Sequence, residues 1–86
     1  MRNTPLINKI TEEVQILSKT NCFCKVNKLL VCVNPDSHVN EENLYDSLRH
    51  ANKKLFGTWT EIQIEQDDIP EQVAILKSIE GEKSTK

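Results

Sequence analysis

The feature that most constrains the fold is the stretch CFCKVNKLLVCV, residues 22–33, which is dense in β-branched and large apolar side chains. Such a composition predicts β structure. Asn27 and Lys28 divide the stretch into two apolar halves, and Asn tolerates the positive φ that a two-residue hairpin turn requires. Lysine is a poor second residue for that turn, so one long strand is the alternative. We favour the hairpin.

Apolar residues spaced three and four apart predict a helix on each side of this stretch. Thr4 and Pro5 are typical of a helix start, and the first apolar stripe consists of Ile7, Ile10, Val14 and Leu17. The second helix is predicted to begin after Asn40, a good N-cap, and to end at Gly57. Its buried stripe is predicted to consist of Leu44, Leu48, Ala51 and Leu55.

The last third of the chain predicts a strand and a third helix. Ile62 and Ile64 alternate with polar residues, as in a strand with one buried face. Asp68 and Glu71 then have the spacing of a capping box, which predicts a helix that ends at Gly81. The inward residues of this helix would be Ile69, Val73, Leu76 and Ile79.

The predicted order of elements is therefore α-β-(β)-α-β-α. It indicates a small α+β fold, a two-layer sandwich with an antiparallel or mixed sheet of two to three strands and the helices on one face. Residues 1–81 are expected to form a single compact domain. The charged residues 82–86 are expected to be a disordered tail.

All three cysteines lie within residues 22–33, and with His38 they supply the four ligands of a zinc site: Cys22, Cys24, Cys32 and His38. Their spacing, C-x-C-x7-C-x5-H, differs from the C-x2-C or C-x4-C of structural zinc sites. The hairpin would also place Cys32 on the opposite sheet face from the other two cysteines. We therefore expect core cysteines and no cofactor. A zinc-stabilised module is the weaker alternative.

The same pairing leaves large apolar residues on the sheet face opposite the helices: Phe23, Leu30, Cys32 and Trp59. An uncovered sheet face normally turns polar, so this mixture predicts a protein–protein patch with a polar rim. A chain of 86 residues buries a smaller fraction of its surface on folding than a larger domain does, so its stability is marginal. Marginal stability also favours association. We predict a non-enzymatic interaction or regulatory module that forms a homo-oligomer, with a dimer favoured, and that also binds another protein.

The alternative function is a nucleic-acid-binding regulator that uses Arg49, Lys53 and Lys54. A net charge of −2 and a pI near 5.6 weigh against it. No nucleotide-binding or hydrolase motif is present, so we expect no catalytic residues and no enzyme. The sequence has no signal-peptide pattern, no run of about 18 apolar residues and an odd number of cysteines. These features favour a cytoplasmic protein without a membrane partner.

Overall fold

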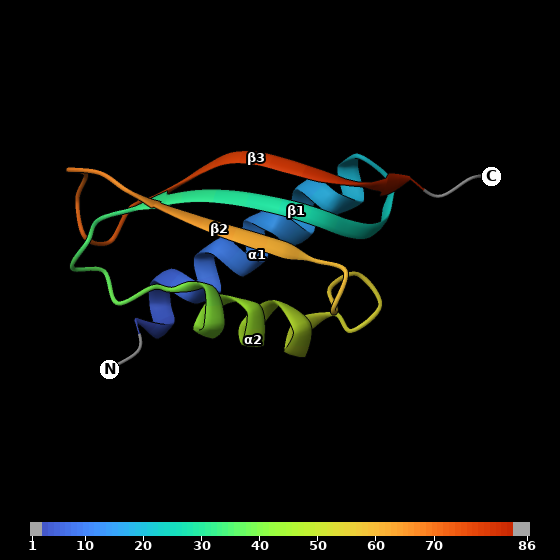
Figure 1. Ribbon diagram of the computed structural model, residues 1–86, viewed down its shortest axis with the longest axis horizontal. Helices are drawn as coiled ribbons and strands as arrows, with labels where there is room; N and C mark the ends of the chain where they lie inside the picture. Colours follow the sequence, from blue (N-terminus) through green and yellow to red (C-terminus); the bar gives the residue numbers. More distant parts are fainter. Residues whose placement is uncertain (1–2, 84–86) are drawn as a thin grey trace.

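The computed structural model describes residues 3–83. In this range the elements follow in the order α1 (Thr4–Thr20), β1 (Phe23–Val33), α2 (Glu41–Ala51), β2 (Glu61–Gln66) and β3 (Ala74–Lys83). The strands form one mixed sheet in the order β2-β1-β3, with β1 parallel to β2 and antiparallel to β3. Both helices cover the same face of this sheet (Figure 1). The predicted small α+β fold with helices on one face is confirmed.

Both helices begin with asparagine caps. The Asn3 side chain accepts a hydrogen bond from the Leu6 N–H at 3.3 Å, one residue before the predicted start of α1. At α2, the predicted cap Asn40 exchanges side chain–backbone hydrogen bonds with Asn43, at 2.8 and 3.0 Å. This helix is shorter than predicted. It ends at Ala51, which is exposed and not part of a buried stripe.

Residues 22–33 do not form the favoured hairpin; β1 is one strand from Phe23 to Val33. Val26 lies opposite Gly81 and Lys28 lies opposite Glu80, so Asn27 is an extra residue in the ladder. Such a β-bulge shifts the alternation of side chains by one position. Val26 and Leu29 therefore both point into the core, each 0% exposed. The bulge gives these two residues the inward positions that the hairpin was expected to give them.

The predicted third helix is also wrong, because residues 74–83 form β3. Leu30 lies opposite Ser78 and Val31 opposite Leu76, so a second bulge falls at Lys77. It lets Leu76 and Ile79 pack against the core from one strand although they are three residues apart. That spacing is the one expected on a helix face.

The strand β3 continues through Gly81 and ends at Lys83, two residues into the predicted tail. Residues 84–86 lie outside the described range.

The core is centred on β1, whose Val26, Leu29, Val31 and Val33 are all fully buried. The strand β2 pairs only with the second half of β1. Beside the first half, the loop of residues 52–60 takes the place of a strand. The Val26 N–H donates to the Leu55 carbonyl at 2.9 Å, and the Thr60 hydroxyl donates to the Val26 carbonyl at 2.7 Å. This loop therefore lies at the end of the molecule where β1 begins (Figure 1).

Candidate functional site

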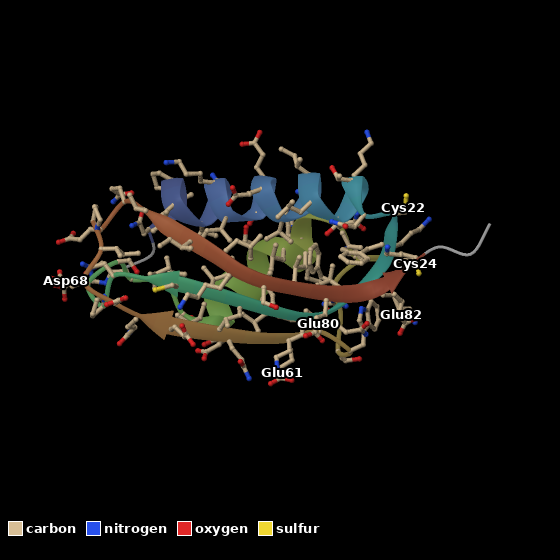
Figure 2. All side chains as sticks on the ribbon, turned by 90° about the horizontal axis from the view of Figure 1, so that it is seen from above. Cys22, Cys24, Glu61, Asp68, Glu80 and Glu82 are labelled. Carbon is tan, nitrogen blue, oxygen red and sulfur yellow. The ribbon has the colours of Figure 1, made fainter. Side chains whose placement is uncertain are left out.

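The three cysteines differ in their surroundings. Cys32 is 2% exposed, whereas Cys22 and Cys24 are exposed, so the expectation of core cysteines is wrong for these two. Cys22 precedes β1 with a φ of 58°, in the left-handed region that glycine favours. Figure 2 shows Cys22 and Cys24 at the end of the molecule opposite Asp68.

The structure does not bring the four predicted zinc ligands together. Cys24 and Cys32 lie on one extended strand, and the chain between them spans roughly 26 Å. His38 follows the far end of that strand, in the loop before α2. Within residues 3–83, no three His, Cys, Asp or Glu side chains are grouped closely enough to hold a metal ion.

The four predicted interface residues do not form one patch either. Phe23 is half-buried and packs against the core. It lines a hollow together with Leu55 and with Lys19 of α1. A third bulge explains the difference. Phe23 lies opposite Lys83 and Lys25 lies opposite Glu82, so Cys24 is an extra residue and the alternation shifts again.

Trp59 is held in place by its own loop. Its indole N–H donates to the Leu55 carbonyl at 3.2 Å, and the Lys25 ammonium lies 5.0 Å from the ring centroid. A Cβ at Gly57 would come within 2.5 Å of the ring. Gly57 was predicted as the C-cap of the second helix, but its position instead makes room for Trp59.

The open sheet face is covered by charged side chains. Lys28, on β1, has Glu61 on β2 and Glu80 on β3 as its neighbours in register. Figure 2 shows these two glutamates on the side of the sheet away from α1. Further along, the Lys77 ammonium bonds to the Glu65 carboxylate at 3.0 Å. Because Glu65 is on β2 and Lys77 on β3, this ion pair passes over β1, where Cys32 is the register partner of Glu65. Leu30, on the same face, is half-buried.

The hydrogen bond that Lys77 donates to Glu65, and then the negative charge of Glu65, raise the pKa of Lys77 above the usual lysine value. A raised lysine pKa means that the ion pair stabilises the folded state below pH 10.5. That contribution is lost as the pH rises through the higher pKa of the folded state. The exposed position of both side chains keeps the contribution small.

Besides Trp59, which is 37% exposed, two exposed apolar side chains lie at the start of β3. Val73 is 40% exposed and Ile75 is 44% exposed. Beyond β3, no strand of the described chain pairs with its outer edge. Sequence reasoning missed this surface because it placed Val73 inside a helix.

The cations proposed for nucleic-acid binding are exposed at the end of α2 and in the loop that follows. Of these, Lys54 lines a hollow of about 580 Å³ together with Lys19 of α1. Sequence reasoning missed Lys19, because nothing in the sequence pattern places it beside Lys54. A neighbouring hollow of about 650 Å³ lies between α1 and α2, and both hollows are lined by Gln15 and Ile16.

No family model matches the chain, and neither a curated protein nor a solved structure shows significant similarity to it. Among the helices of residues 3–83, none is both long and apolar enough to span a membrane.

Proposed function

We propose that the chain is a non-enzymatic protein-interaction or regulatory module that binds a second copy of itself through the outer edge of β3. The observation that supports this is the edge itself, which is ten residues long and lies at the side of the sheet. Unpaired backbone groups at such an edge accept a further strand, and natural proteins usually protect long edges against this.

The two edges of the sheet differ in their protection. The strand β2 is short, six residues, and shortness discourages pairing. Both edge strands carry charged side chains, so charge does not distinguish them. In contrast, β3 is longer, and exposed apolar side chains lie just before it, at Val73, and near its start, at Ile75. A single bulge at Lys77 interrupts it. The edge of β3 is therefore the better surface for association.

Charge complementarity favours a second copy as the occupant. When two β3 strands pair antiparallel about a twofold axis near Ser78 and Ile79, Lys77 of each copy lies near Glu80 of the other. The twofold axis repeats each contact. Opposite charges directly across from each other stabilise a pair of strands.

Glu80→Lys tests this pairing, with Glu61→Lys as the matched control, because both glutamates flank Lys28 in register. In native mass spectrometry and light scattering, we expect a wild-type dimer that Glu80→Lys weakens roughly tenfold or more. Glu61→Lys should leave the dimer intact, and the double variant Lys77→Glu/Glu80→Lys should restore it. A monomeric wild type, or equal weakening by both single variants, would overturn the proposal.

The cytoplasmic location, the binding of another protein and the nucleic-acid alternative on Arg49, Lys53 and Lys54 stay predictions. We prefer protein association over nucleic-acid binding, because the exposed apolar side chains at β3 suit contacts with a protein and do not bind phosphate groups.

A further inference from the structure

We infer that the chain has a second interaction surface, a groove between α1 and α2 that binds an acidic amphipathic helix of a partner protein. This surface, called here the helix groove, joins the two hollows that share Gln15 and Ile16. Its α1 wall runs from Asn8 to Lys19, about 17 Å at the rise of an α-helix. That length matches about three turns of a docked helix.

The centre of the helix groove offers an apolar contact beside small residues. Ile16 is 59% exposed, more than any other large apolar side chain of the described chain. Across from it, α2 contributes Ser47 and Ala51 to the lining, and their short side chains leave the hollow open. A helix packs well where its side chains enter such a gap between ridges, and exposed apolar residues of this kind anchor helices in grooves.

The charges at one end of the helix groove specify an acidic partner. Lys19 comes from α1 and Lys54 from the loop after α2, and both line the same hollow. His50 lines the adjoining hollow, and with Arg49, Lys53 and Asp46 it also borders a small depression of about 260 Å³, where the two cations outnumber the one carboxylate. Glu12 is the one acidic residue in the lining of the two hollows. Acidic side chains on a docked helix would therefore meet complementary charge at this end.

The lining favours a protein helix over a nucleic acid. Nucleic-acid grooves combine cations with exposed aromatic rings on which bases stack. Here the aromatic residue of the lining is Phe23, which packs against the core, and Trp59 is not part of the lining. The exposed apolar side chain in the helix groove is aliphatic, and Ile16 suits the apolar face of a helix better than a base.

The test is a selection from a displayed library of helical peptides of about 12 residues, with random charges on the polar face and apolar residues on the other. The full chain is the target. We expect selected peptides to be acidic and to shift the amide resonances of Gln15, Ile16 and Ala51. A selection that yields no binder at the helix groove, or yields basic or neutral helices, would overturn the inference.

Matched variants separate charge from loss of structure. Lys19→Glu and Lys54→Glu together should weaken the best peptide by tenfold or more, and Lys19→Glu alone should weaken it in part, whereas Lys9→Glu, the same charge reversal on α1 outside the groove, should not. Ile16→Ser should also weaken binding, and its high exposure protects the fold from this change. If single-stranded or duplex oligonucleotides bind the groove more tightly than the acidic peptides, with steep salt dependence, the surface is a nucleic-acid site and the inference fails.

Discussion

At the scale of single residues, the three cysteines provide a direct test of the structure. Cys22 and Cys24 are exposed and Cys32 is 2% exposed. With a thiol reagent under native conditions, we expect two thiols to react quickly. The third should react slower by roughly an order of magnitude or more, since it must wait for local opening. Lys77→Ala, which removes the ion pair that passes over β1, should speed the slow thiol. Three fast thiols would contradict the burial of Cys32.

The packing around residue 81 leaves room only for glycine. A Cβ at this position would collide with the Lys25 carbonyl oxygen and come within 2.9 Å of the Phe23 ring. Because the Lys25 carbonyl oxygen belongs to the backbone, the strand β1 itself would have to move to relieve this clash. Gly81→Ala should lower the free energy of unfolding in urea by about 2 kcal/mol. The exposed neighbour Glu82 serves as the control: Glu82→Ala should change it by no more than about 0.5 kcal/mol.

At the scale of elements, the sequence predicted both helices, the strand at Ile62 and Ile64, and the two layers, because those features follow from regular periodicity. Three β-bulges account for the errors in the two strands β1 and β3. Each adds one residue to a strand and breaks the alternation, at Cys24, Asn27 and Lys77. A bulge depends on the partner strand, so the chain's own pattern does not reveal it. The bulge at Cys24 removes Phe23 from the predicted patch. The bulge at Asn27 produces the side-chain pattern expected of a hairpin, and the bulge at Lys77 produces the spacing expected of a helix.

Two adjacent leucines test the register of β1. Leu29 is 0% exposed in the core, whereas Leu30 is half-buried on the opposite sheet face. Leu29→Ala should cost about 3 kcal/mol in the free energy of unfolding, since it leaves a cavity under the helices. Leu30→Ala should cost about 1 kcal/mol or less. Similar losses for the two variants, measured at equal protein concentration, would show that the strand has another register.

At the scale of the whole molecule, charge is distributed unevenly. Residues 61–83 hold seven acidic and two basic side chains, whereas the helix groove has cations at one end. The two proposed interactions should therefore respond to salt to different degrees. Raising the ionic strength should weaken the acidic peptide at the groove, and should change the β3-mediated dimer much less, because salt screens the repulsion between two acidic sheets as well as the attraction between Lys77 and Glu80. Dissociation constants at low and high salt measure both effects. A dimer that weakens with salt as steeply as the peptide complex would contradict edge pairing through β3.

The helices connect all parts of the sheet into one unit. The helix α1 contacts β1 and β3, while α2 contacts β2 and α1, and one cluster of buried residues includes members from both helices and from β1. The loop of residues 52–60 is tied to this unit through Thr60, whose hydroxyl donates to the Val26 carbonyl and accepts from the Gly57 N–H at 3.2 Å. Such a structure should unfold in a single transition.

Thr60→Val keeps the shape of the side chain and removes both hydrogen bonds, so it should lower the free energy of unfolding by about 2 kcal/mol. The single tryptophan, Trp59, reports on the loop by fluorescence, and far-ultraviolet circular dichroism reports on the helices. If the loop and the core unfold together, both signals should shift to the same lower urea midpoint in the variant. A shift in fluorescence alone would show that the loop unfolds separately and that the described chain is not one cooperative unit.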